Sequence, residues 1–227
     1  MAMNKEMISS CYKLLEELFI YPEARDNEWV DAERKNVKNY PKSIRKPIKD
    51  FLKNPASTSN DEYINTLEIT PPCPLYLGTY LFDEPNSCRG AGMSGRNNYM
   101  MELSGIYNHF GFQLNGKELA DYLPVILNFL SVSLAQEEKD SIGIRRRFME
   151  HHLLIGLPAM LESLEKYESP YGSLIEALVV ILGEDLALME DLPAWMPPAN
   201  ENPPKDISCS GCEYEFLSDD EREKEQA

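Results

Sequence analysis

The sequence predicts an all-helical protein, and three observations lead to this class. Apolar residues recur with a helical period of about 3.6 residues along most of the chain. No run alternates between apolar and polar residues as a β-strand does, and no strand–helix–strand alternation is present. Prolines and glycines fall mainly between the periodic segments, where they end helices. We expect one helical domain over residues 1–190 and a Pro-rich, acidic and flexible tail over residues 191–227.

Four helices are predicted in the first part of the chain. An amphipathic helix covers residues 7–19, and a polar helix covers residues 27–40, each followed by a proline. A short helix spans residues 43–53. Ser59 followed by Glu62 forms a capping-box pattern, which predicts that the fourth helix begins there.

The middle of the chain contains a break, an aromatic segment and a loop. Residues 71–74 read Pro-Pro-Cys-Pro, which makes a stiff break. Residues 75–82 are apolar and aromatic, and residues 83–95 contain a proline and three glycines. We therefore expect residues 83–95 to form a loop.

Four longer helices are predicted in the second half. The first covers residues 93–110 and ends at a glycine, and the second covers residues 118–134 with a proline in its first turns. The third covers residues 142–167, where Pro158 should kink it. The fourth covers residues 173–189 and is apolar enough to be a core helix.

The charge and the termini limit the possible partners and compartments. A formal net charge of -16 repels phosphate backbones, so we expect no nucleic-acid partner. The same charge suits a partner with a basic segment, although solubility alone also explains it. No apolar run reaches the roughly 18 residues that cross a bilayer, and the N-terminus has no signal-peptide core. We therefore expect a cytoplasmic protein. We also expect free thiols, because its five cysteines are an odd number and widely scattered.

No motif indicates catalysis, a cofactor or a metal. Gly90, Gly92 and Gly95 imitate a dinucleotide fingerprint, but no strand precedes them, so a flexible loop explains them better. Cys209 and Cys212 form a C-x-x-C pair without the second pair that a structural zinc site needs. No phosphate-binding loop and no paired nucleophile and base occur. We predict a non-enzyme with no cofactor and no metal site.

The basic and histidine residues allow two interpretations. His109, His151 and His152 lack metal-ligand spacing, which favours structural roles. The cluster Arg145-Arg146-Arg147 is either a solvated helix face paired with neighbouring acids, or an anchor for a partner's carboxylates. The sequence favours neither interpretation of the arginines. The acids available for pairing are Glu137, Glu138 and Glu150.

Several motifs resemble the NarJ branch of the NarJ/TorD/DmsD maturation chaperones. The resemblance follows the helix order over residues 7–190 and is specific over residues 67–135. Its most specific element is the helix start written E-L-x-D-x-L-P. The matching elements are Tyr-Leu-x-x-Tyr-Leu-Phe at 76–82, Arg89-Gly90, Tyr107-x-x-x-Gly111-Phe112, Glu118-Leu119-x-Asp121-Tyr122-Leu123-Pro124 and Ser169-Pro170-Tyr171.

This resemblance implies a chaperone for a complex iron–sulfur molybdoenzyme, of the kind used in nitrate assimilation or anaerobic respiration. It would bind the apo catalytic subunit, often through its N-terminal leader, while cofactors are inserted and before targeting. It would be a monomer or a domain-swapped dimer. The client is left open between a nitrate reductase and its chlorate, selenate, dimethyl sulfide or ethylbenzene relatives. The alternatives are a permanent accessory subunit of the oxidoreductase and a small nucleotide-binding enzyme.

We place the client-binding groove between the helices at 93–110 and 118–135, with the segment 76–82 as its roof. Aromatic and aliphatic side chains would contact the apolar side of the client, and acidic side chains would receive its basic residues. The predicted site residues are Tyr76, Tyr80, Phe82, Asp83, Glu84, Arg89, Gly90, Tyr107, Glu118, Asp121, Leu123, Pro124 and Leu127.

Overall fold

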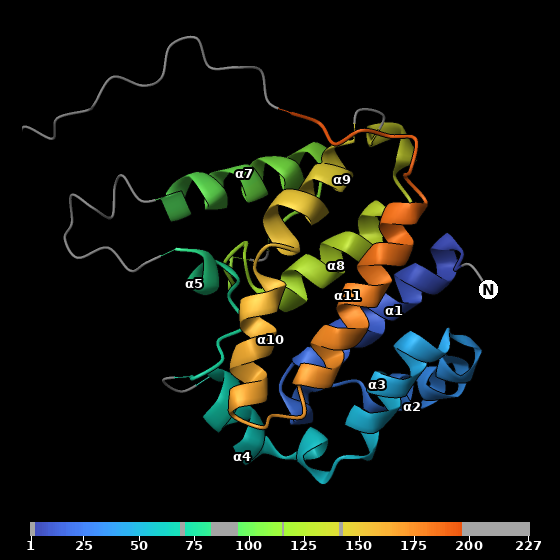
Figure 1. Ribbon diagram of the computed structural model, residues 1–227, viewed down its shortest axis with the longest axis vertical. Coiled ribbons are helices and arrows are strands. Elements are labelled where there is room, and N and C mark those ends of the chain that lie inside the picture. Colours follow the sequence, from blue (N-terminus) through green and yellow to red (C-terminus); the bar gives the residue numbers. More distant parts are fainter. Residues whose placement is uncertain (1–2, 69–70, 83–94, 115, 141–142, 197–227) are drawn as a thin grey trace, which may run out of the picture. The chain divides into compact units, whose positions relative to one another are not determined.

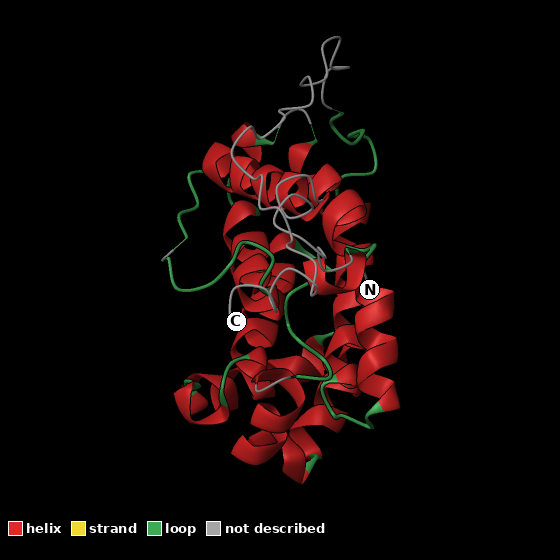
Figure 2. Ribbon diagram, turned by 90° about the vertical axis from the view of Figure 1, so that its left-hand side faces the viewer, coloured by secondary structure: helices red, strands yellow, loops and turns green. Residues whose placement is uncertain are grey.

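The computed structural model describes residues 3–196, apart from residues 69–70, 83–94, 115 and 141–142. Helices form the regular structure of this part of the chain (Figure 1), and no strand occurs among its residues (Figure 2). The nearest approach to a sheet is an isolated antiparallel bridge between Tyr76 and Tyr122. The all-helical prediction is confirmed.

Polar side chains cap the first turns of several helices in the first part of the chain. Asn4 accepts a hydrogen bond from the Met7 amide at 2.9 Å, and Ser59 accepts one from the Glu62 amide at 3.2 Å, as the capping pattern predicted. The elements are α1 (Lys5–Phe19), η1 (Pro22–Ala24), α2 (Asn27–Asn36), η2 (Val37–Asn39), α3 (Lys42–Lys53), η3 (Pro55–Thr58), α4 (Asn60–Tyr63) and a π-helical turn η4 (Ile64–Glu68).

The second half contains more, shorter helices than the sequence predicted. Residues 95–110 and 172–187 are helical, close to the predicted bounds, whereas two other predictions need correction. The elements are α5 (Gly78–Leu81), α7 (Gly95–Phe110), α8 (Leu123–Ser133), η5 (Glu137–Lys139), α9 (Ile144–Phe148), a π-helical turn η6 (Met149–Leu153), α10 (Leu157–Lys166) and α11 (Gly172–Ala187).

The helix predicted from residue 118 begins only at Leu123. The Leu123 amide donates to the Leu75 carbonyl at 2.8 Å, and the Leu77 amide donates to the Asp121 carbonyl at 3.0 Å. These bonds hold residues 121–123 against a distant segment, so residues 118–122 form a turn where the local pattern favours a helix. Pro124 then occupies the first turn of α8, where a missing amide hydrogen costs least.

The prediction of one kinked helix over residues 142–167 is wrong. The chain instead forms α9, the π-helical turn and a separate α10, with a turn at residues 154–156 between them. Pro158 lies in the first turn of α10, so it starts a helix and does not kink one. Gly156 allows the turn to approach α5, because a Cβ there would lie 3.1 Å from Leu77 Cδ2.

The core lies around α1 and α11, whose main partners are α8 and α3 respectively. Figure 1 shows α1, α8 and α11 passing through the middle of the described unit. The prediction that the last helix is a core helix is confirmed by side chains of α11 that are fully buried. They are Leu174, Ile175, Leu178, Ile181 and Leu182.

Two polar links cross the interface between α1 and α8. The Ser9 and Ser131 hydroxyls lie 2.9 Å apart. The Asn128 side-chain amide donates to Glu16 Oε1 at 2.8 Å. Burial outweighs this hydrogen bond and raises the pKa of Glu16 to about 7.

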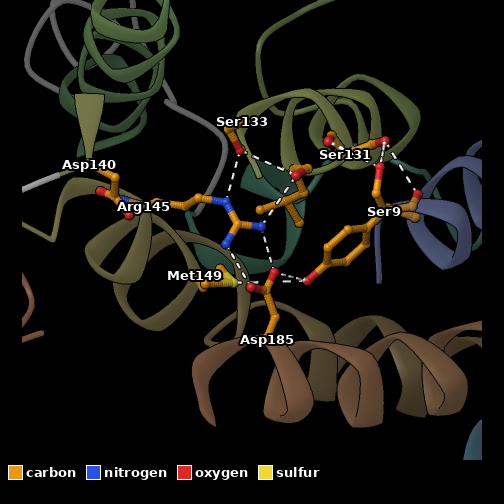
Figure 3. Close-up of polar contacts among 9 residues, drawn as sticks. Ser9, Ser131, Ser133, Asp140, Arg145, Met149 and Asp185 are labelled. Atoms are coloured by element: carbon orange, nitrogen blue, oxygen red, sulfur yellow. Dashed lines mark hydrogen bonds and ion pairs between the residues drawn. The ribbon is translucent and has the colours of Figure 1, made fainter. Parts of the chain in front are cut away.

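A buried ion pair joins four helices at one end of the core (Figure 3). The Arg145 guanidinium of α9 donates to both carboxylate oxygens of Asp185 on α11, to Oδ1 at 2.7 Å. Arg145 also donates to Ser133 Oγ of α8 at 2.9 Å. The Tyr12 hydroxyl of α1 donates to Asp185 Oδ2 at 2.7 Å. Arg145 and Asp185 are 3% and 0% exposed, so these partners replace water almost completely.

The described chain continues past α11 to residue 196, and residues 1–196 form one compact unit. The Trp195 amide donates to the Gly143 carbonyl at 3.0 Å. Gly143 has φ +76°, and a Cβ there would collide with the Pro193 carbonyl oxygen. The domain boundary at residue 190 stays a prediction, and the predicted tail from residue 197 onward lies outside the described residues.

Asp185→Ala is expected to lower the free energy of unfolding by about 3–5 kcal/mol, because it leaves the Arg145 charge buried without its carboxylate. Urea denaturation followed by circular dichroism measures this loss. Glu176→Ala is the matched control, because Glu176 is an exposed acid on the same helix. If the two variants lose the same stability, the ion pair does not hold the core.

Glu16→Gln is expected to make stability less dependent on pH. The folded pKa of Glu16 is about 7 against an ordinary value of 4.5, so folding favours the protonated form. Stability from this group is therefore complete below the ordinary pKa and is lost as pH rises to about 7. The gain from Glu16→Gln should grow across that interval and level off above it. Urea denaturation at several pH values measures it, and Glu6→Gln, at an exposed position of α1, should show no such trend.

Candidate functional site

Two of the motifs behind the family resemblance are docked against each other. Residues 75–77 and 121–123 run antiparallel and exchange the two backbone hydrogen bonds described above. The rings of Tyr76 and Tyr122 lie beside this bridge, with centroids 5.0 Å apart. Because two segments more than 40 residues apart depend on each other here, the motifs form one structural unit.

Asp121 is the polar centre of this unit. Its side chain is fully buried, and Oδ2 accepts hydrogen bonds from the Gly78 amide at 3.0 Å and from Arg96 Nη2 at 3.4 Å. Oδ1 is buried and has no hydrogen-bond partner. Gly78 begins α5 and Arg96 lies in the first turn of α7, so one carboxylate holds the two helices that flank residues 83–94.

A glycine is required at position 78 because there is no room for a Cβ atom, and not because of its backbone angles. A Cβ at this position would lie 2.6 Å from Asp121 Oδ2 and 3.1 Å from Arg96 Nε. The first distance is shorter than any ordinary contact, so a side chain would separate the α5 amide from the carboxylate.

Two tyrosine hydroxyls fix the segment that precedes α8. The Tyr76 hydroxyl donates to Glu118 Oε2 at 2.6 Å. Burial, reinforced by this carboxylate, raises the pKa of Tyr76, so the tyrosine stays a donor. The Tyr107 hydroxyl of α7 donates to the Ala120 carbonyl at 2.7 Å. Residues 118–122 are therefore held from both sides while their backbone is not helical.

Four of the predicted client-binding residues are buried in the core. Tyr107 packs on Phe129 of α8 with ring centroids 4.8 Å apart, and Leu123, Pro124 and Leu127 are also buried. In this conformation the four side chains fill the interior and do not line an open groove. Asp121, predicted as an acidic rim residue, is likewise buried and bonded to this chain's own Arg96. Client contact at these positions requires the elements to move apart, and it stays a prediction.

The other predicted residues divide into a partly exposed group and a group outside the described residues. Tyr76, Tyr80, Phe82 and Glu118 are each partly exposed. The Tyr80 hydroxyl is buried without a hydrogen-bond partner, although the rest of its side chain is partly exposed. Asp83, Glu84, Arg89 and Gly90 lie outside the described residues.

Sequence reasoning missed Gly78 and Arg96, which complete the Asp121 site. A signal for Arg96 was available, because a basic side chain in the first turn of a helix is opposed by the helix dipole. Such a residue needs an acidic partner from elsewhere in the chain. No sequence signal indicates that Gly78 must make room for a carboxylate, because this requirement depends on tertiary structure.

Each arginine of the 145–147 cluster has a different internal partner. Arg146 pairs with Glu150 at 2.8 Å, as the first interpretation expected. Arg147 pairs with Glu102 of α7 at 2.7 Å, and Arg145 pairs with Asp185. Arg145 and Arg147 are only 3% and 8% exposed. A solvated helix face is therefore wrong for these two arginines, and in this conformation both are occupied by this chain's own carboxylates.

The histidines do not form a common site. His109 Nε2 is hydrogen-bonded to the Lys139 carbonyl at 2.6 Å. His151 is exposed and His152 is buried, so the two neighbours point in different directions. Burial lowers the pKa of His152, whose Nε2 lies 3.1 Å from Glu102 Oε1. Among the residues that the structure describes, no group of three potential metal ligands comes together.

The fold defines an all-helical protein in which two distant motifs and Asp121 form one structural unit. Residues 38–161 match the model of the family described as nitrate reductase delta subunit, and the chain belongs to this family, whose members are molybdoenzyme maturation chaperones. The resemblance found in the motifs is thereby confirmed. A search of curated proteins gives no significant match.

Family membership places this chain among proteins that bind a molybdoenzyme catalytic subunit and that are not catalysts themselves. The matched region contains both docked motifs and the Asp121 site. Within the described ranges, no helix has the length and apolarity needed to cross a membrane.

Gly78→Ala is expected to destabilise the protein by about 1–3 kcal/mol, because the new Cβ collides with the Asp121 carboxylate. Thermal unfolding measures the change. Gly105→Ala is the matched control, because a Cβ at this exposed position in the middle of α7 meets nothing within 4 Å. The control should gain about 0.5–1 kcal/mol from its better helix propensity. A Gly78→Ala protein as stable as the wild type contradicts the described close approach.

Proposed function

We propose that this protein binds the apo catalytic subunit of a complex iron–sulfur molybdoenzyme through a basic and apolar N-terminal leader. It holds the subunit while cofactors are inserted and releases it for targeting afterwards. The observation that carries this proposal is the Asp121 carboxylate, which is fully buried and has one oxygen without a partner. A buried carboxylate oxygen that lacks a partner is a strong acceptor for an incoming cation.

The leader's basic side chain would replace Arg96 at Asp121. The contact between Arg96 and Asp121 is a single one of 3.4 Å, and the Arg96 side chain is 32% exposed. A client arginine can bond to both oxygens of a carboxylate, which Arg96 does not do here. Replacement would release α7 from α5 at this point. This exchange would therefore both strengthen binding of the leader and open the site.

Partly exposed aromatic residues at the same place would receive the apolar part of the leader. Phe82 follows α5, lies against Tyr99 with ring centroids 5.4 Å apart and stays partly exposed. Tyr80 contributes a second partly exposed ring on α5. Opening between α5 and α7 would enlarge this aromatic surface, and the buried Tyr107, Leu123 and Leu127 would become available only after that step. Asp83, Glu84, Arg89 and Gly90 remain part of the proposed site.

Charge adds to this recognition over longer distances. The net charge of -16 attracts a basic leader before contact and increases its rate of association. A cytoplasmic location fits the proposal, because the client must be loaded before export. The client stays open among the nitrate reductase group and its relatives.

Affinity purification from anaerobically grown native cells, with and without molybdate, tests the function. We expect a catalytic subunit that lacks molybdenum cofactor to co-purify, and to do so in larger amounts without molybdate. Equal stoichiometry with the fully loaded enzyme would instead support a permanent accessory subunit. Recovery of no molybdoenzyme subunit in either condition rejects the proposal.

Arg96→Gln is expected to tighten binding of an arginine-containing leader peptide several-fold, because it removes the internal competitor for Asp121. Asp121→Asn should weaken the same binding by about tenfold or more. Fluorescence anisotropy with the labelled leader of the co-purified subunit measures both. With a leader whose arginines are replaced by glutamine, the two substitutions should have no effect. Weaker binding by Arg96→Gln contradicts the exchange at Asp121.

A further inference from the structure

The chain carries a basic surface, although its net charge is strongly negative. Eight of its 22 basic residues lie between positions 34 and 53, where Asp50 is the only acidic residue. These positions cover the end of α2, η2 and all of α3. We refer to the side chains as the basic face, which consists of Arg34, Lys35, Lys38, Lys42, Arg45, Lys46, Lys49 and Lys53.

Helical spacing collects most of these charges into one stripe. Lys42, Lys46, Lys49 and Lys53 follow one another on α3 at intervals of three or four residues, and Arg45 lies three residues after Lys42 and four before Lys49. The opposite side of α3 is buried, through Ile44, Pro47, Ile48 and Phe51, and packs against α11. Arg45 Nη1 donates to the Lys38 carbonyl at 3.0 Å, which joins η2 to the stripe.

Most of these charges have no carboxylate partner among the described residues. Lys46 pairs with Asp50 at 3.7 Å, and both side chains are largely exposed. Among the described residues, no carboxylate lies within ion-pair distance of the other seven basic side chains. Arg145, Arg146 and Arg147 by contrast are all paired. The basic face therefore presents charge to the outside and does not stabilise the fold through ion pairs.

The geometry points to an interaction surface for a short acidic segment of a partner polypeptide, and we propose this as the occupant of the basic face. Screening limits surface charges to about 8 Å at physiological salt, so a short segment on α3 responds to the stripe and little to the rest of the protein. α3 has 12 residues, so it presents about 18 Å of charged surface, enough for a short peptide segment.

Extended polyanions fit this surface less well. A membrane or a long duplex reaches beyond the stripe and meets the remaining surface, whose acidic excess repels it. None of the exposed large apolar side chains lies on α2 or α3, so nothing there can insert into lipid. Tyr40 is 5% exposed and Trp29 is half-buried, so the face offers no open aromatic platform for bases.

This surface goes beyond the proposed leader site, because its charge has the opposite sign and its residues belong to other elements. A client or assembly partner could thus be recognised through a basic leader at Asp121 and an acidic segment on α3. The basic face does not depend on the leader hypothesis, since an acidic segment can bind whether or not a leader does.

The test uses the full chain and a labelled peptide of about six residues, rich in Glu and Asp, at about 150 mM salt. In an extended conformation this peptide spans about 20 Å, which matches the length of α3. Lys42→Glu combined with Lys53→Glu should weaken peptide binding by about tenfold. Lys13→Glu combined with Lys166→Glu is the control, because it replaces two exposed lysines elsewhere and changes net charge equally. The control should change affinity by less than about twofold.

Equal losses in the two double variants overturn the proposal, because net charge alone then governs binding. Tighter binding of the wild type to phosphatidylserine vesicles or to a long DNA duplex than to the peptide also overturns it. Leader binding is measured on the same variants by anisotropy. If Lys42→Glu with Lys53→Glu loses only the acidic peptide, the two sites are independent, and failure of one does not decide the other.

Discussion

The buried ion pair of Arg145 and Asp185 constrains how the helices around it can pack. Two charges removed from water are tolerated only if every donor and acceptor finds a partner, and Tyr12, Ser133 and the Leu130 carbonyl supply the remaining partners. Those groups come from α1 and α8, while the pair itself joins α9 to α11. Any shift of one helix leaves a charge unsatisfied. The network therefore fixes how four helices meet, and the apolar side chains fill the space that it defines.

The three consecutive arginines of α9 contact three different parts of the protein. Arg145 enters the core, Arg147 pairs with Glu102 of α7, and Arg146 donates to carbonyls of residues 189 and 192, which follow α11. A helix of five residues thus positions α7, which carries Arg96, relative to the core. Asp185 and Asp121 make an instructive contrast. Both oxygens of Asp185 have partners, whereas Asp121 keeps one oxygen without a partner, and the proposed leader would bind there.

The net charge of the whole chain and the local charge on α3 have opposite signs. The total is -16, which suits the proposed basic leader, whereas the basic face on α3 has the opposite sign over the length of a single helix. Screening keeps these two fields apart, because each decays over about 8 Å at physiological salt. A protein that assists the assembly of a large enzyme can therefore offer different surfaces to differently charged segments. The net charge alone describes only one of them.

The sequence by itself determined the helical class, the family and most helix positions, because periodicity, caps and prolines act over a few residues. It also placed Asp121 and Tyr76 in one candidate site through motifs. Tertiary structure decided what local signals cannot contain. Residues 118–122 leave the helical pattern because distant groups bond the Ala120 and Asp121 carbonyls and the Leu123 amide. Arg145 leaves the surface because Asp185 lies opposite it in space. Gly78 and Arg96 join the site for the same reason: their roles depend on a carboxylate that is far away in sequence and near only in the folded chain.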